Sequence, residues 1–281
     1  MLDTIIDALI DVLKLLPFLF IAFLILEYIE HKMSKKNEKI LVNNKKLGPI
    51  LGGLLGAFPQ CGFSAMATKL FSSRVITLGT LIAVYLSTSD EMLPILLSNG
   101  VSVLLLLKII GIKLLIGIIL GFLIDLIYRK KYDHANSIHE MCHDDDCHCE
   151  KGIFHSSIHH TINIAVYLLV TTLLINIIIY LVGEESIKEF LLNNKGTYFL
   201  SSLIGLIPNC ASSVIMSEIY LSGMISLGSL FSGLLTGAGV GLLILFKTNK
   251  NLKENIMIVS LLYIIGVVVG YLIDWIGLVL L

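Results

Sequence analysis

Long apolar stretches dominate the sequence and limit the solvents in which the chain can fold. Eight of them lie at about residues 5–29, 48–71, 75–97, 101–128, 161–182, 198–222, 224–246 and 256–280. Each is close to the roughly 20 residues that a helix needs to cross about 30 Å of hydrocarbon. Only 15% of all residues are charged, whereas soluble proteins carry about a quarter. We therefore predict an all-α, polytopic membrane protein.

The charged residues gather in four short segments, at 31–47, 129–151, 183–197 and 247–254. Outside these segments there is no basic stripe, which argues against nucleic-acid binding. The N-terminal stretch begins with acidic residues and has no small-residue cleavage site after it, so we do not interpret it as a signal peptide. No P-loop GxxxxGK[ST] is present to power a pump. We expect neither an enzyme nor a resident cofactor.

The two groups of four apolar stretches resemble each other. Shifting the chain by 149 residues aligns GAFPQCGFSA, from Gly56, with GLIPNCASSV, from Gly205, and IGIILGFLID, from Ile116, with IGVVVGYLID, from Ile265. Matches of Pro, Cys, Gly and Asp are uncommon among lipid-facing helices, so we interpret them as an internal duplication. The predicted units are a first membrane repeat at 1–128, a linker at 129–160 and a second membrane repeat at 161–281.

Basic residues indicate that the two repeats have opposite orientations. Segment 31–47 has six Lys and one Glu, whereas its counterpart 183–197 has two Lys and three Glu. Segment 247–254 has three Lys where the first repeat has no charge. Lys and Arg accumulate in cytoplasmic loops, so equivalent loops lie on opposite sides. We predict inverted-topology repeats, a cytoplasmic linker and both termini outside the cell.

This topology requires an odd number of membrane crossings in each repeat, whereas four complete spans would give an even number. One element must therefore enter and leave the membrane on the same side. Proline breaks helices because it lacks a backbone donor and clashes with the preceding turn. Pro59 and Pro208 therefore divide their stretches into half-helices, and 48–71 is the best re-entrant candidate. A second break is expected at 87–94. Counting the broken stretches twice gives about ten hydrophobic segments.

Inverted repeats with broken helices are typical of secondary transporters, whose substrates bind where the breaks meet. Two thiols, two amides and several hydroxyls would then converge and suit a thiophilic metal or metalloid. The alternative is that each buried Cys only packs as a small apolar residue. The predicted substrate-binding residues are Pro59, Gln60, Cys61, Ser64, Pro208, Asn209, Cys210, Ser212 and Ser213.

Three carboxylates close to the breaks are candidates for coupling transport to protons: Asp90, Glu91 and Glu218. Carboxylates inside a membrane are costly and are usually functional. The alternative is that they lie at the interface and are simply solvated.

Four other charged residues within the apolar stretches have structural rather than functional interpretations. Asp125 and Asp274 repeat near the ends of the last stretches, where anchoring at the interface is the favoured role. Lys108 and Lys113 are expected to extend to the outer boundary of the membrane.

The linker is dense in metal ligands, because residues 134–160 hold seven of the eight His and three of the five Cys. Imidazole, thiolate and carboxylate suit Zn²⁺ or a similar ion, and the run of Asp would also suit Mn²⁺. A solvated polar linker is the alternative. The thiols are expected to be reduced in the cytoplasm. The candidate metal ligands are His139, Cys142, His143, Asp144, Asp145, Asp146, Cys147, His148 and Cys149.

The two Gly-x-x-Pro-x-Cys motifs, the STSDEMLP segment, the duplicated halves and the His/Cys-rich middle resemble the ten-helix heavy-metal exporter family. Its bacterial members are labelled arsenic efflux proteins or manganese transporters, and the family is distantly similar to arsenical permeases. The resemblance covers nearly the whole chain. It implies metal or metalloid export, with the Pro, Cys and Ser of both motifs forming the core of the site.

The leading hypothesis is a proton-coupled secondary exporter of a metalloid such as arsenite, or of a divalent metal such as Mn or Zn, in the cytoplasmic membrane. Its partners are the ion, protons and the lipid bilayer, and a homo-oligomer is left open. The competing hypotheses are a metal-gated channel or sensor, and a membrane thiol redox enzyme.

Overall fold

A computed structural model of the chain describes residues 47–58, 61–88, 92–98, 100–128, 153–182, 196–208 and 210–277, with scattered positions between 9 and 24. These residues form helices and short connections, and no strand occurs among them. This agrees with the all-α prediction. Three helical runs in this part are long and apolar enough to cross a membrane, Val103–Tyr128, Leu227–Thr248 and Leu252–Trp275.

The helices are α3 (Gly48–Gly56), α4 (Cys61–Ser72), α5 (Leu78–Ser87), α6 (Met92–Ser98), α7 (Val103–Tyr128), α9 (Ile153–Val182), α11 (Thr197–Gly205), α12 (Cys210–Leu221), α13 (Leu227–Thr236), α14 (Val240–Thr248) and α15 (Leu252–Trp275). Their bounds repeat along the chain. Helices α3, α4 and α5 begin and end 149 residues before α11, α12 and α13, and α7 begins 149 residues before α15.

Each half contains the same tightly packed pair of antiparallel helices, α5 against α7 and α13 against α15. A Cβ atom on Gly79 of α5 would overlap the carbonyl oxygen of Gly121 in α7, and one on Gly228 would overlap that of Gly270. The helix backbones approach closely because the side chains between them are hydrogen atoms. This small-residue contact is the usual way in which helices associate in membranes.

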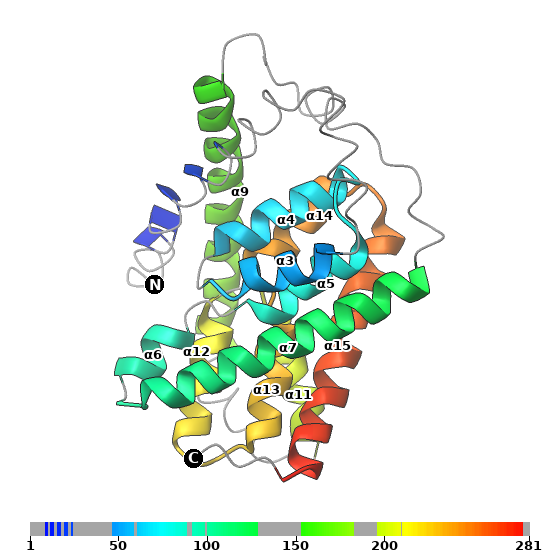
Figure 1. Cartoon of the computed structure of the whole chain (residues 1–281). Coiled ribbons are helices and arrows are strands. Elements are labelled where there is room, and N and C mark those ends of the chain that lie inside the picture. Colours follow the sequence, from blue (N-terminus) through cyan, green and yellow to red (C-terminus); the bar gives the residue numbers. More distant parts are fainter. Residues whose placement is uncertain are drawn as a thin grey trace.

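The two halves then pack against each other reciprocally. Helix α4 of the first half lies beside α14 of the second, and α12 of the second lies beside α6 of the first. Helices α5 and α13 meet between these pairs, where fully buried side chains such as Tyr85, Leu86 and Phe231 form the core. Figure 1 shows the helices of both halves interleaved in one bundle.

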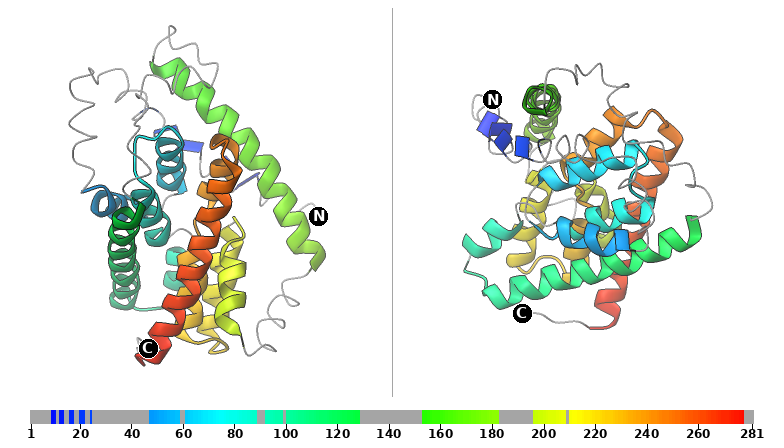
Figure 2. Two further views of the ribbon diagram at one scale, coloured as in Figure 1. Left: turned by 90° about the vertical axis from the view of Figure 1, so that its right-hand side faces the viewer. Right: turned by 45° about the horizontal axis from the view of Figure 1, so that its top comes forward.

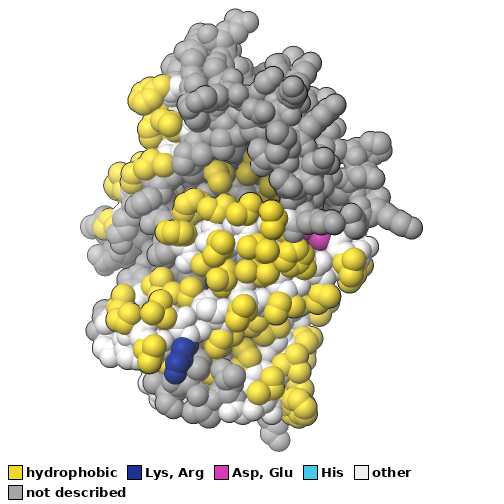
Figure 3. Space-filling model, viewed as in Figure 1, with side chains coloured by type: hydrophobic (Ala, Val, Ile, Leu, Met, Phe, Trp, Pro, Cys, Tyr) yellow, Lys and Arg dark blue, Asp and Glu magenta, His cyan; other side chains and the backbone are white. Residues whose placement is uncertain are grey.

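The long helix α9 lies along the outside of this bundle, where it packs against α14 (Figures 1 and 2). Its Tyr167 hydroxyl donates to the Leu243 carbonyl oxygen at 3.2 Å. The described surface in Figure 3 is largely hydrophobic, with very few charged side chains. Exposed apolar residues recur along α7 and α15, including Leu104, Leu126 and Ile264. Such a continuous apolar face is suited to lipid rather than water.

Candidate functional site

Helix breaks lie at both predicted motifs. Helix α3 ends at Gly56 and α4 begins at Cys61, while α11 ends at Gly205 and α12 begins at Cys210. Helices of 9 and 12 residues are about 14 and 18 Å long, so each is too short to cross about 30 Å of hydrocarbon. Both predicted breaks are therefore present, and each begins a new helix with a cysteine.

Some of the predicted binding groups fall outside the described part of the structure. These are residues Pro59, Gln60 and Asn209, and the side chains of Cys61 and Cys210. Pro208 is half-buried at the second break. The convergence of the two thiols and two amides thus remains a prediction.

The predicted serines lie in two different surroundings. Ser64 is buried on α4, and a Cβ atom on Gly241 of α14 would lie 3.3 Å from its hydroxyl oxygen. Ser212 and Ser213 of α12 line a small cavity in which Ser64 does not take part. Ser64 of the first motif therefore lies against α14, whereas Ser212 and Ser213 of the second lie beside α6 and α13.

Buried hydroxyl groups surround the contact between Ser64 and α14. The Thr68 and Tyr85 hydroxyl oxygens are 2.6 Å apart. The single Thr68 hydroxyl proton has two close acceptors, the Tyr85 hydroxyl and the Ser64 carbonyl oxygen at 2.6 Å, while Tyr85 donates to the Gly241 carbonyl oxygen at 3.2 Å. These bonds join α4 and α5 of the first half to α14 of the second. Thr68 and Tyr85 are not predicted from the sequence, because a single hydroxyl group in an apolar helix carries no distinctive pattern.

The cavity beside Ser212 and Ser213 has a volume of about 20 Å³, enough for one water-sized particle. Its remaining lining comes from helices α6, α7 and α13 and from the residues that directly follow α5 and α13: Thr88, Met92, Lys113, Gly233, Leu234 and Gly237. The cavity lies where α5 and α13 both end, so it faces backbone carbonyls as well as hydroxyl groups.

Lys113 is the charged residue of this cavity, and its predicted position was wrong. We expected it to extend to the membrane boundary, but its side chain is only 1% exposed. Its ammonium group donates to the carbonyl oxygen of Thr88 and, at 3.0 Å, to that of Leu234. The physical reason is that position 113 shares the buried face of α7 with Gly117 and Gly121, which pack against α5, so its ammonium group reaches the carbonyl group just after α5. Lys108 on the same helix is exposed, and its extension to the membrane boundary stays a prediction.

The predicted coupling carboxylates have separate outcomes. Asp90 and Glu91 lie outside the described residues, in the break between α5 and α6. Glu218 is exposed on α12. The linker ligands from His139 to Cys149 also lie outside the described residues. Within the described ranges no group of three or more His, Cys, Asp and Glu side chains is arranged to hold a metal ion.

Asp125 and Asp274 each hold the start of a neighbouring helix, and their position at the membrane interface stays a prediction. Asp125 accepts from the Gly79 backbone N–H at 2.8 Å and from the Thr77 hydroxyl at 2.6 Å. Asp274 accepts from the Gly228 N–H at 2.7 Å and from the Tyr198 hydroxyl at 2.8 Å. The first N–H groups of a helix have no partner inside it, and a carboxylate also suits the positive end of the helix dipole.

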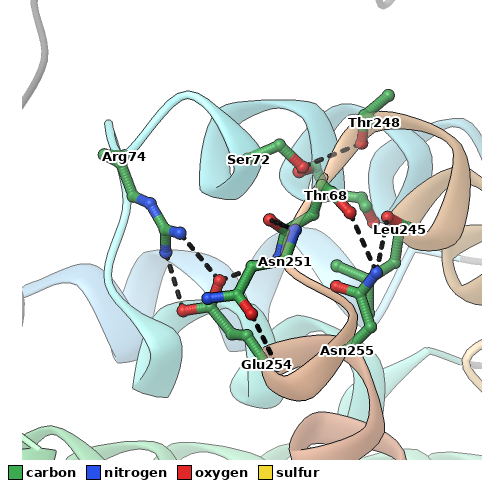
Figure 4. Close-up of polar contacts among 9 residues, drawn as sticks. Thr68, Ser72, Arg74, Leu245, Thr248, Asn251, Glu254 and Asn255 are labelled. Atoms are coloured by element: carbon green, nitrogen blue, oxygen red, sulfur yellow. Dashed lines mark hydrogen bonds and ion pairs between the residues drawn. The ribbon is translucent and has the colours of Figure 1, made fainter.

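A polar cluster joins the two halves near the start of α5 and the start of α15 (Figure 4). The Arg74 guanidinium forms a bidentate ion pair with Glu254, with both distances 2.7 Å. Nearby, the hydroxyl oxygens of Ser72 and Thr248 are 2.8 Å apart, at the last residues of α4 and α14. Connections 73–77 and 249–251 therefore lie at the same end of the molecule.

Comparison with known proteins identifies the family. A family profile described as "Putative, 10TM heavy-metal exporter" matches residues 1–191 and 150–279. The chain belongs to this family. No curated protein and no solved structure matches the chain significantly. The family and the three apolar helical runs together make this a multi-pass membrane protein of a metal exporter family, as the sequence motifs indicated.

Proposed function

We propose that the protein is a secondary exporter that moves a heavy-metal or metalloid ion out across the cytoplasmic membrane, driven by protons. The observation that carries this proposal is the pair of matched helix breaks, each followed by a helix that begins with cysteine, at Cys61 and Cys210. Broken helices expose unpaired backbone groups at membrane depth, and transporters use them as binding sites. The family supports an exporter and a metal cargo.

The substrate binds between the two break motifs. The Cys61 and Cys210 thiolates supply soft ligands, and Gln60, Asn209 and the neighbouring serines supply oxygen atoms. Soft ligands favour a thiophilic ion such as arsenite, whereas Mn²⁺ would depend more on oxygen. Proton transfer at Asp90, Glu91 or Glu218 couples release to the gradient. The His- and Cys-rich linker collects or senses the ion on the cytoplasmic side.

Described contacts support an inverted topology. The hydrogen bond between the Gly79 N–H and Asp125 holds the end of α7 beside the start of α5. Gly79 follows Arg74 by five residues along the chain. Arg74 in turn pairs with Glu254 at the start of α15. The end of α7 and the start of α15 therefore lie at the same end of the molecule, so these equivalent helices run in opposite directions. This end carries Arg74 and the three Lys of 247–254, which suits the cytoplasmic side.

Transport into everted vesicles tests the proposal. Vesicles that contain the full chain should accumulate arsenite or a divalent metal against its gradient when acidified inside. The C61S/C210S double variant should lose transport of a thiophilic ion by at least tenfold. Accumulation of neither class of ion would contradict the exporter, and unchanged arsenite transport by the double variant would remove the thiols from the mechanism.

A linker variant provides the matched control. Replacing Cys142, Cys147 and Cys149 by Ser changes the same chemical group at the same membrane without touching the helix breaks. We expect this variant to retain the maximal rate and to lose activity only at low ion concentration. A loss as large as that of C61S/C210S would move the soft ligands from the breaks to the linker.

A further inference from the structure

The ammonium group of Lys113 lies between the C-terminal ends of α5 and α13, and carbonyl groups at both ends accept hydrogen bonds from it. We propose that Thr88, Leu234 and the adjoining hydroxyl groups form a monovalent-cation site that the ammonium group of Lys113 occupies as a tethered cation. The proposal concerns the cavity beside α12 and does not depend on which ion is exported. Its consequence for coupling rests on the proposed function.

The first observation is that both acceptors are carbonyls that a helix leaves without a partner. The last four carbonyl groups of an α-helix have no N–H donor within it. Thr88 directly follows the last residue of α5. Leu234 would normally accept from the N–H of Ala238, but that N–H donates to Thr236 at 2.9 Å. The Leu234 carbonyl is thus free to accept from Lys113 at 3.0 Å.

The second observation is the electrostatics of the position. The carbonyl end of a helix carries roughly half a negative charge, and here the ends of α5 and α13 converge on one ammonium group. Helix ends of this kind coordinate the coupling cation in many secondary transporters. Ser212 and Ser213, two hydroxyl-bearing residues, line the same cavity. Carbonyl and hydroxyl oxygens together are the ligands of a small hard cation.

The third observation is that only one half carries the lysine. Leu262 on α15 is the equivalent of Lys113, since it lies 149 residues later, and it is also fully buried. The duplicated scaffold therefore folds with an apolar side chain at this place. A lysine is a costly replacement inside a membrane, which indicates a role for the charge rather than for packing.

The consequence for transport is that this site needs no cation from solution. In the intact protein the ammonium group holds the two halves together through Thr88 of the first and Leu234 of the second. Removing it leaves a carbonyl site that a free monovalent cation can enter. Transport would then become dependent on that cation.

The test is rescue of Lys113→Ala by small cations in the full-length protein in detergent. Thermal unfolding is compared at constant ionic strength in choline, Na⁺, K⁺ and methylammonium chloride. We expect the midpoint of the variant to rise by about 3 °C or more in at least one of the three small cations relative to choline. The wild type and Lys108→Ala should unfold at the same temperature in all four salts. A variant with no salt preference would overturn the cation site.

A second variant separates charge from hydrogen bonding. Gln at position 113 can donate to both carbonyls but carries no charge, so Lys113→Gln should unfold below the wild type. If it matches the wild type, hydrogen bonding alone explains the lysine and the proposal is wrong. This comparison also decides the matter if Lys113→Ala does not fold.

Transport assays distinguish this proposal from the exporter itself. Wild-type vesicles should transport equally well in choline and in the other three salts, while Lys113→Ala should require the small cation that stabilises it. If small cations stabilise Lys113→Ala against unfolding but the wild type transports no ion, the result supports the cation site and contradicts the exporter. Transport by Lys113→Ala that is independent of the salt would overturn the role of Lys113 in coupling.

Discussion

The two halves of the protein share their backbone contacts and differ in the polar side chains at their centre. Gly79 meets Asp125 in the first half as Gly228 meets Asp274 in the second, with distances of 2.8 and 2.7 Å. By contrast, Lys113 of the first half corresponds to an apolar leucine in the second. Shared contacts therefore build the fold, and unshared polar groups are where the halves differ in chemistry.

This difference separates scaffold from function by a physical criterion. A leucine in the core needs no partner, whereas a buried lysine or tyrosine must find acceptors that offset its lost hydration. Lys113 and Tyr85 both find theirs in carbonyls of the opposite half, Leu234 and Gly241. The asymmetric residues thus act across the junction of the halves, which is the surface that must rearrange if the site is to open on alternate sides.

The largest expected effect comes from enlarging the shared glycine contacts. Gly79→Ala and Gly228→Ala each place a methyl group against a backbone carbonyl, and backbone can yield little. We expect each to destabilise the protein by about 3 kcal/mol, with a marked fall in the yield of monodisperse protein. Gly111→Ala on α7 is the control, because nothing lies within 4 Å of its added methyl. Unequal destabilisation by Gly79→Ala and Gly228→Ala would show that the two halves are not equivalent at this contact.

The next effect tests the shared carboxylates. Asp125→Ala and Asp274→Ala each remove an acceptor of one backbone N–H and one hydroxyl. With about 1 kcal/mol for each of the two hydrogen bonds at these partly exposed carboxylates, both variants should lower the thermal midpoint by similar amounts. Asn substitutions keep one acceptor oxygen and should lose less. Loss of transport with full stability would instead give these carboxylates a chemical role.

Much of the fold follows from the sequence because lipid imposes simple rules. The apolar runs, the breaks at the prolines and the duplication at 149 residues all depend on local chemistry, and the helix bounds agree with them. The burial of Lys113 was not predicted, because it depends on which distant helix ends approach α7. One local signal was available. Residues 109, 113, 117 and 121 lie four apart on the buried face of α7, so Lys113 shares its face with the close-packed glycines.

The site is less predictable than the fold for a related reason. Both motifs begin a helix with cysteine, as duplication implies, yet Ser64 contacts α14 and Ser213 lines the cavity beside α13. A pattern that repeats along the chain does not give each copy the same neighbours. The neighbours depend on side chains such as Tyr85 that the other half lacks.

A smaller effect tests one of the unshared groups. Tyr85→Phe removes the hydroxyl that joins Thr68 to the Gly241 carbonyl, and this position is Leu234 in the second half. We expect a loss of about 1 kcal/mol, measured as a lower thermal midpoint. Tyr167→Phe, which removes a single half-buried bond to Leu243, should cost less. An equal cost for both would mean that the buried hydroxyl cluster adds nothing beyond one hydrogen bond.

The smallest effect tests the ion pair between the halves. Arg74 has φ 62°, and Gly223, its equivalent in the second half, has φ 73°. This left-handed conformation costs an L-residue about 1 kcal/mol but costs glycine little. The pair with Glu254 is partly exposed and contributes about 0.5 kcal/mol. Arg74→Ala should therefore be slightly destabilising, while Arg74→Gly should match or exceed the wild type in thermal midpoint. If Arg74→Gly is instead as destabilised as Arg74→Ala, the ion pair contributes more than the backbone strain costs. The first half would then depend at this position on a charge that the second half, with Gly223, lacks.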